Sequence, residues 1–190
     1  RPIDLHVMVM ETLGAKVTYD SGFIIASLNA NGLRGGVIDF PKISVGATES
    51  AIMTAVLAKG ETKILNAAQE PEIVDLGKCL INAGADIIGL GTNTIIINGV
   101  EELTPIKHSV VPDRIEAGSF AVAASITNGH VEISNVRSND LDIFLKVLRS
   151  TGSQIDVFEN SFIVSSSSRP ISHNVITQAH PGFPTDLQAQ

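Results

Sequence analysis

The sequence lacks most of what a disulfide, a zinc site or a base-stacking surface requires. Its 190 residues include one cysteine, Cys79, no tryptophan and only 4% aromatic residues. A single cysteine excludes an internal disulfide and a cysteine-based zinc site, and it is typical of a reducing compartment. The scarcity of aromatic rings argues against single-strand nucleic-acid binding by stacking.

Long apolar runs and clusters of positive charge are missing too. No apolar stretch approaches the roughly 20 residues that a transmembrane helix needs. The net charge of −7 repels phosphate backbones, the basic residues are scattered, and the histidines show no metal-ligand spacing. We therefore expect a cytoplasmic protein without a nucleic-acid, membrane, metal or cofactor site and without an obligate protein partner.

The sequence does contain an apolar content of 44%, carried by Ile, Val, Leu and Ala, and an internal repeat. Segments 13–17, 83–87 and 151–155 each place a glycine between a helical and a strand pattern, at a spacing of about 70 residues. Pro41 and Pro112 keep the same step ahead of two further helical patterns. The repeat predicts an α/β (α+β) protein built from duplicated units.

Two kinds of helix are predicted within these units. Segments 71–83 and 140–150 are amphipathic and should lie on a sheet, whereas 47–58 and 116–126 are apolar on nearly every side and should be buried all round. Each amphipathic helix leads through its glycine into a hairpin such as 86–98. The predicted unit is a strand, a buried helix, a strand, a surface helix and a hairpin.

A boundary between two lobes is predicted near Val111 and Pro112, where a strand pattern ends in a proline and the next buried helix begins. Residues 1–111 would hold two repeats, the first of them shortened, and residues 112–190 would hold about one. Because the sequence begins at Arg1 inside a motif and stops where a helix should open, we expect it to be a piece of a longer protein.

Residues 42–48 are a candidate anion site. A helix should start here, so the free amides of Ser44, Val45 and Gly46 would face outward from the positive end of its dipole, with Lys42 adding a charge. The alternative is an ordinary N-cap by Ser44 and a solvated Lys42.

Carboxylates stand beside prolines at both ends of the sequence. Asp186 follows Pro184 ahead of what resembles an opening helix, and Asp4 follows Arg1 and Pro2. Such a carboxylate is a candidate base or a hydrogen-bond acceptor for a ligand, while a helix cap and a solvated arginine are the ordinary alternatives.

Three more charged residues, Glu70, Asp113 and Arg114, lie at predicted helix starts. Asp113 and Arg114 occupy the repeat-equivalent place of Lys42, although an exposed capping pair is the simpler interpretation. The helix dipole explains Glu70, which precedes a proline, without any function.

Five segments in order resemble the UDP-N-acetylglucosamine 1-carboxyvinyltransferase family: 1–6, 42–48, 70–75, 112–116 and 183–190. The resemblance covers the whole chain and implies inside-out α/β barrel lobes made of repeated βαβαββ units. It also implies transfer of the enolpyruvyl group of phosphoenolpyruvate to the 3′-hydroxyl of UDP-N-acetylglucosamine with release of phosphate. That reaction is the first committed step of peptidoglycan synthesis and needs no cofactor.

The resemblance further implies roles for the candidate residues. Arg1 would bind the phosphate of phosphoenolpyruvate, and Asp186 would act as the base at the 3′-hydroxyl. The uracil would be contacted by Pro2, Asp4 and Leu5. The diphosphate would be bound by Lys42, Ser44, Val45 and Gly46. Supporting positions in the cleft would be Glu70, Asp113 and Arg114.

Members of this family carry a catalytic cysteine on a mobile loop before the position of Arg1, and a lysine and an arginine that hold phosphoenolpyruvate. None of these segments is in the sequence, so the 190 residues alone are expected to be inactive. Two alternatives stay open: a transferase that uses shikimate 3-phosphate, and a non-catalytic repeat domain that binds nucleotide or protein partners.

Overall fold

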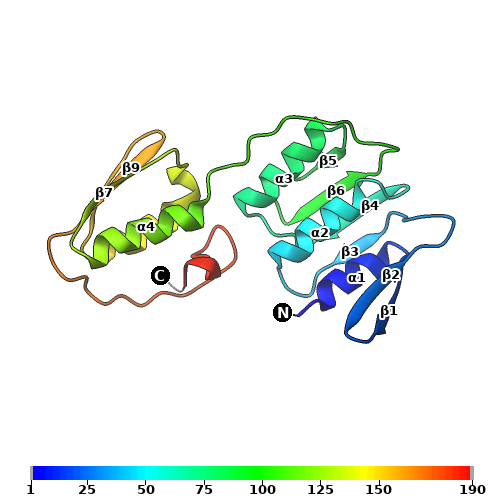
Figure 1. Ribbon diagram of the computed structural model, residues 1–190, viewed down its shortest axis with the longest axis horizontal. Helices are drawn as coiled ribbons and strands as arrows, with labels where there is room; N and C mark the ends of the chain where they lie inside the picture. Colours follow the sequence, from blue (N-terminus) through cyan, green and yellow to red (C-terminus); the bar gives the residue numbers. More distant parts are fainter. Residues whose placement is uncertain (1, 189–190) are drawn as a thin grey trace. The chain divides into compact units, whose positions relative to one another are not determined.

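The computed structural model describes residues 2–188, which form two units (Figure 1). The first unit ends at Val110 and the second begins at Val111. This division lies next to the boundary predicted from the sequence. The assignment of the units to two lobes of a larger fold stays a prediction.

The first unit combines three helices with a four-stranded sheet and a separate hairpin. Its elements in chain order are α1 (Asp4–Thr12), β1 (Lys16–Asp20), β2 (Phe23–Ser27), β3 (Val37–Asp39), α2 (Val45–Ala55), β4 (Glu61–Leu65), α3 (Pro71–Asn82), β5 (Asp86–Ile88) and β6 (Thr94–Asn98). The sheet has the order β3-β4-β6-β5, in which only β3 and β4 are parallel. The strands β1 and β2 pair only with each other among the described strands.

Alternation along the central strands of this sheet produces the core of the first unit. In β4, Thr62 and Ile64 are buried while Glu61 and Lys63 face solvent. Ile64 lies opposite Ile95 of β6, and both side chains are fully buried. Burial of one such side chain stabilises a fold by about 1.5 to 3 kcal/mol, so these pairs hold α2 on the sheet.

The second unit repeats this plan with fewer elements. These are α4 (Arg114–Ile126), β7 (His130–Ser134), a 3₁₀ turn η1 (Ser138–Leu141), α5 (Asp142–Ser150), β8 (Gln154–Val157), β9 (Ser161–Ser165) and a second 3₁₀ turn η2 (Thr185–Leu187). Its antiparallel sheet has the order β7-β9-β8, and α4 packs on β7 and β9. Its buried cluster, which includes Phe162, shares no residue with the cluster of the first unit.

The predicted repeat of a mixed α/β fold is confirmed. Gly14, Gly84 and Gly152 follow helices α1, α3 and α5 with φ angles of +96°, +108° and +102°. Only glycine adopts these angles without strain, which explains why it recurs at the turn from helix to strand. Asn66 and Asn135, which follow β4 and β7, likewise share a φ of 53°.

Three details of the prediction are wrong. The helices α2 and α4 are not buried all round, because Met53 and Phe120 are more than half exposed. Within the described residues each unit has one such helix on one sheet, so one side of the helix has nothing to pack against. The predicted strand before Pro112 is absent from the described chain, and the helix predicted to start at Asp140 begins as the η1 turn.

Candidate functional site

The only parallel strand pair of the described chain, β3 with β4, defines a candidate site in the first unit. Beyond the carboxyl ends of these strands, residues 40–46 lead into α2 and residues 66–72 lead into α3. Ligands of open α/β sheets bind outside the carboxyl ends of parallel strands. We call the region formed by residues 40–46 and 66–72 the strand-end site.

Hydrogen bonds hold the two segments of the strand-end site together. The Asn66 Nδ2 donates to the carbonyl oxygen of Phe40 at 2.9 Å. The amide of Ala68 donates to Oγ1 of Thr48, in the first turn of α2, at 3.0 Å, and both groups are buried. The starts of α2 and α3 are therefore fixed relative to each other.

The start of α2 retains free backbone donors. The Oγ of Ser44 accepts from the amide of Ala47 at a long distance of 3.4 Å. The amides of Val45 and Gly46 have no acceptor among the described residues. The Ser44 cap predicted as the ordinary alternative is thus present, yet it leaves two donors at the positive end of the helix, where an anion binds favourably. Lys42 is exposed beside them.

His6, which was not among the sequence-predicted site residues, lies over the same helix start. Its Nδ1 and the Oγ of Ser50 are 2.7 Å apart. A Cβ on Gly46 would lie 3.5 Å from Cε1 of His6, an ordinary contact. The imidazole therefore lies beside Gly46, one of the two residues with a free amide. No local signal indicates this arrangement, because it depends on the packing of α1 across α2.

Glu49 adds a carboxyl group to this neighbourhood. Burial is the main cause that raises the pKa of Glu49 above its ordinary value, and the negative charge of Glu72 raises it further. The imidazole of His6 acts in the opposite direction. Glu49, Glu72 and His6 thus influence one another electrostatically near the start of α2.

Glu70 departs most from its sequence interpretation. The sequence explains Glu70 by the helix dipole, but only 7% of the residue is exposed and its side chain makes no cap hydrogen bond to α3. Its Oε2 is buried and has no hydrogen-bond partner among the described residues. An interaction with the helix dipole alone does not satisfy a buried carboxylate oxygen.

The residues predicted to frame a uracil ring lie at the start of α1. Pro2 and Asp4 are exposed, and the side chain of Leu5 packs into the core of the unit. The helix begins at Asp4 itself and has Ile3 at its N-cap, so the alternative that Asp4 caps a helix starting at Leu5 is wrong. Arg1 lies outside the described residues.

In the second unit the predicted pair Asp113 and Arg114 divides into two roles. Asp113 caps α4, because its Oδ1 accepts from the amides of Ile115 at 2.8 Å and Glu116 at 3.0 Å. Only 5% of Arg114 is exposed. The interpretation as an exposed capping pair is therefore wrong for this residue. It lines a polar pocket of about 310 Å³ together with Pro184 and Leu187.

Asp186 is presented on a firmly held turn. Its side chain is exposed, while Phe183 and Leu187 on either side are buried in the core of the second unit. Leu187 lies against Gly118 of α4, where a Cβ would come within 2.7 Å of its Cδ2. No side chain caps the η2 turn, and the alternative that Asp186 caps the helix predicted after it stays open. Most of the helix predicted over residues 188–190 falls outside the described chain.

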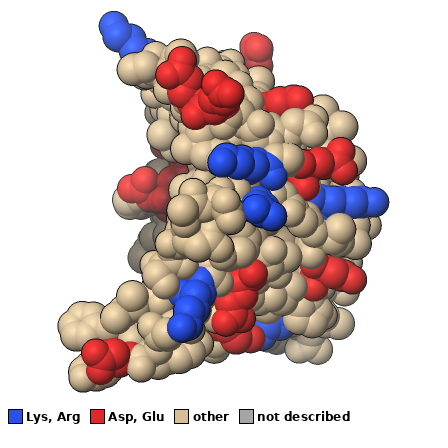
Figure 2. Space-filling model, turned by 90° about the vertical axis from the view of Figure 1, so that its right-hand side faces the viewer, with Lys and Arg blue, Asp and Glu red and all other residues tan. Residues whose placement is uncertain are grey.

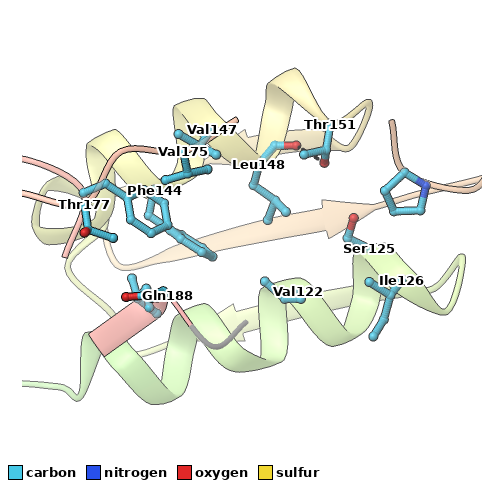
Figure 3. Close-up of a pocket in the computed structure, with 13 residues that line it drawn as sticks. Val122, Ser125, Ile126, Phe144, Val147, Leu148, Thr151, Val175, Thr177 and Gln188 are labelled. Carbon is cyan, nitrogen blue, oxygen red and sulfur yellow. Dashed lines mark hydrogen bonds between the residues drawn. The ribbon is translucent and has the colours of Figure 1, made fainter. Parts of the chain in front are cut away.

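A larger pocket of about 370 Å³ lies between α4 and α5 (Figure 3). Its walls are mainly apolar, with Val122 and Ile126 from α4 and Phe144 and Leu148 from α5. None of its lining residues is acidic or basic, and the hydroxyl of Ser125 is bonded to that of Ser153 at 2.7 Å. This pocket therefore offers shape but no group for acid–base chemistry.

Neither a patch of one charge on the face drawn in Figure 2 nor a metal site is found among the described residues. On the face drawn in Figure 2, basic and acidic side chains are interspersed. Within residues 2–188, no group of three or more His, Cys, Asp or Glu side chains is placed to hold a metal ion. None of the described helices has both the length and the apolar character required to cross a membrane.

Comparison with known proteins identifies the family. The whole chain, residues 1–190, matches the family described as EPSP synthase (3-phosphoshikimate 1-carboxyvinyltransferase). The chain belongs to the EPSP synthase family. Among the curated relatives of this family member are proteins named UDP-N-acetylglucosamine 1-carboxyvinyltransferase. The one from Azorhizobium caulinodans is 51% identical over 191 residues, and the one from Zymomonas mobilis is 50% identical over 190 residues.

These alignments include all of the EPSP synthase-family chain but only 44% and 45% of the two relatives. The chain thus spans less than half the length of the curated relatives it matches. Its predicted resemblance to UDP-N-acetylglucosamine 1-carboxyvinyltransferases is confirmed.

Solved structures of enolpyruvyl transferases share the fold of this family member. The enolpyruvyl transferase NikO from Streptomyces tendae matches 99% of the chain with a TM-score of 0.85 and 20% identity, over 47% of its own length. An EPSP synthase from Acinetobacter baumannii matches 93% of the chain with a TM-score of 0.62 and 22% identity, over 42% of its own length. At these identities the likeness concerns the fold alone.

Proposed function

We propose that the protein transfers the enolpyruvyl group of phosphoenolpyruvate to the 3′-hydroxyl of UDP-N-acetylglucosamine. The observation that carries this proposal is the identity of about one half, over the whole chain, to proteins named for that activity. The reaction would be a step of peptidoglycan synthesis, and we place it in the cytoplasm.

The strand-end site supports the nucleotide part of the proposal. A diphosphate carries the charge that the two free amides of α2 favour, and Lys42 adds a mobile positive charge beside them. We assign the diphosphate to Lys42, Ser44, Val45 and Gly46. The uracil would then lie at the start of α1, against Pro2, Asp4 and the backbone of Leu5.

Asp186 supports the chemical step. An exposed carboxylate on a turn anchored at both sides has the fixed position that a general base needs. We propose that Asp186 takes the proton of the 3′-hydroxyl while the hydroxyl oxygen bonds to C2 of phosphoenolpyruvate and a general acid from outside these 190 residues protonates C3. One C3 proton then returns to the conjugate base of that acid, the bond between C2 and the phosphate oxygen breaks, and the phosphate leaves with the proton that Asp186 took. The products are the enol ether and inorganic phosphate.

We assign the remaining candidates to binding and support. Arg1 would bind the phosphate of phosphoenolpyruvate, which needs a cation as the phosphate leaves. We assign Glu70 a supporting role in the strand-end site. Asp113 and Arg114 support the Asp186 turn from α4, since Arg114 and the residues Pro184 and Leu187 border one pocket.

The test measures phosphate release by the full-length protein. Release that requires both phosphoenolpyruvate and UDP-N-acetylglucosamine is the expected result. Release with shikimate 3-phosphate instead would favour the second candidate, the activity in the description of the matching family. Binding of UDP-N-acetylglucosamine without release in the presence of phosphoenolpyruvate would favour a non-catalytic nucleotide-binding domain.

A further inference from the structure

The side chain of Glu70 has a buried oxygen whose cost in folding free energy is not explained by the contacts of the first unit. Only 7% of the residue is exposed, and its Oε2 has no hydrogen-bond partner in the described chain. Removing an ionised carboxylate oxygen from water without supplying a hydrogen bond destabilises a fold. A native structure keeps such a group where something other than stability requires it.

The second unit shows that the fold itself does not require an acid here. The N-caps Ser44 and Asp113 and the left-handed Asn66 and Asn135 are separated by the same residue step. That step places Asn139 at the position of Glu70. There the residue lies inside the η1 turn that precedes α5, whereas Glu70 directly precedes α3. The second unit thus continues from its strand to its helix with a neutral residue at this position.

The arrangement of the helices indicates which part of a ligand would meet Glu70. α2 packs against α1 on one side and against α3 on the other. With the uracil at the start of α1 and the diphosphate at the start of α2, the group beyond the diphosphate lies toward the start of α3. Glu70 immediately precedes that start. In a nucleoside diphosphate sugar, the group beyond the diphosphate is the sugar.

We infer that Glu70 accepts a hydrogen bond from a hydroxyl or amide N–H of the sugar in a nucleoside diphosphate sugar. The inference rests on the proposed function, because it uses the nucleotide's direction along α1, α2 and α3. A sugar donor within hydrogen-bond distance of Oε2 would satisfy the oxygen that has no partner among the described residues. Binding thus supplies the donor that the free chain lacks.

The test compares Glu70→Gln with wild type in the full-length protein, measuring the affinities for UDP-N-acetylglucosamine and for UDP and the Tm. We expect the affinity for UDP-N-acetylglucosamine to fall by about 10-fold or more, as for a lost charge-assisted hydrogen bond. The affinity for UDP should change by less than about 2-fold, and the Tm should not fall, because the amide has the shape of the carboxyl group and breaks no hydrogen bond of Oε2 in the free chain. Glu101→Gln, on an exposed segment, is the matched control.

Two results would overturn the inference. Unchanged binding with a lower Tm would make Glu70 a structural helix-start acid, and equal losses for UDP and UDP-N-acetylglucosamine would place its contact outside the sugar. Glu70→Asn, which copies Asn139 of the second unit, repeats the test should the glutamine variant fold poorly. A wild-type protein that does not bind UDP-N-acetylglucosamine contradicts the proposed function itself, whereas a variant that matches an active wild type contradicts only the role of Glu70.

Discussion

At the scale of single residues, Asp186 separates chemistry from binding. It is exposed, while its neighbours Phe183 and Leu187 are buried and hold the turn. Asp186→Asn keeps the shape but cannot accept a proton from the hydroxyl. We expect turnover to fall by about 10² to 10⁴-fold, with a much smaller change in the affinity for UDP-N-acetylglucosamine. Steady-state kinetics and equilibrium binding measure the two effects.

The control for this variant is Asp156→Asn, at an exposed position of β8 in the same unit. It should leave both quantities unchanged. Equal losses of turnover and binding in Asp186→Asn would show that the carboxylate holds the nucleotide and does not act as the base.

Glu49 provides a prediction about pH. Its pKa is raised mainly by burial, so the folded state holds the Glu49 proton more tightly than the unfolded state does. Ionised Glu49 therefore costs stability, and this cost appears as the pH rises from the ordinary pKa of a glutamate through the raised one. Glu49→Gln should raise the Tm near pH 7 and leave it nearly unchanged near pH 3.5, where the carboxyl is protonated in both states.

Thermal unfolding of wild type and variant at the two pH values measures this difference. Glu101→Gln gives the baseline for removing an exposed acid from the same unit. A stabilisation by Glu49→Gln that is the same at both pH values would show that the ionisation of Glu49 does not cause it.

At the scale of elements, the contact between α4 and the η2 turn positions Asp186. A Cβ on Gly118 would lie 2.7 Å from Cδ2 of Leu187 and 3.5 Å from Cζ of Phe144. In Gly118→Ala the overpacking costs about 1 to 3 kcal/mol, against a gain of about 1 kcal/mol in helix propensity. We expect a net loss of about 1 kcal/mol in the free energy of unfolding and a lower turnover, because the turn shifts.

Denaturant unfolding and kinetics of the same variant measure the two losses. Leu187→Ala in the Gly118→Ala background makes room for the added methyl group. The double variant should therefore lose less stability than the two single losses added together. Strict additivity would mean that the methyl group and Leu187 do not meet.

Elements whose residues interact with near neighbours could be predicted from the sequence. The three glycines at the helix ends, the amphipathic helix α3 and the β5–β6 hairpin follow from local conformational preference and periodicity, and the structure contains them. The start of α2 follows from the sequence in the same way, because a helix terminus exposes its amides whatever surrounds it.

The rest of the candidate site depends on contacts between distant segments. His6 reaches Ser50 only because α1 packs on α2, and Glu70 is buried only because its segment is tied to Phe40 and Thr48. An acid before a proline at a helix start has the same local pattern whether it is exposed or buried. Sequence patterns alone therefore could not distinguish a solvated helix start from an unsatisfied carboxyl group.

At the scale of the whole molecule, the two units have separate cores, which predicts independent local stability. Phe162 is fully buried in the cluster of the second unit, and Ile95 is fully buried in that of the first. Phe162→Ala should destabilise the second unit by about 3 to 5 kcal/mol and Ile95→Ala the first by about 2 to 5 kcal/mol. Amide hydrogen exchange then locates each loss, because protection follows the stability of the unit that opens.

We expect Phe162→Ala to lower the protection of β7 and β9 while that of β4 and β6 stays at the wild-type level. Ile95→Ala should produce the reverse pattern, and each variant is the control for the other. Because a substitution is felt only by the cooperative unit that contains it, a parallel loss of protection in both sheets would show that the units unfold together in spite of their separate cores. Separate losses would mean that the strand-end site and the Asp186 turn each depend on the stability of their own unit.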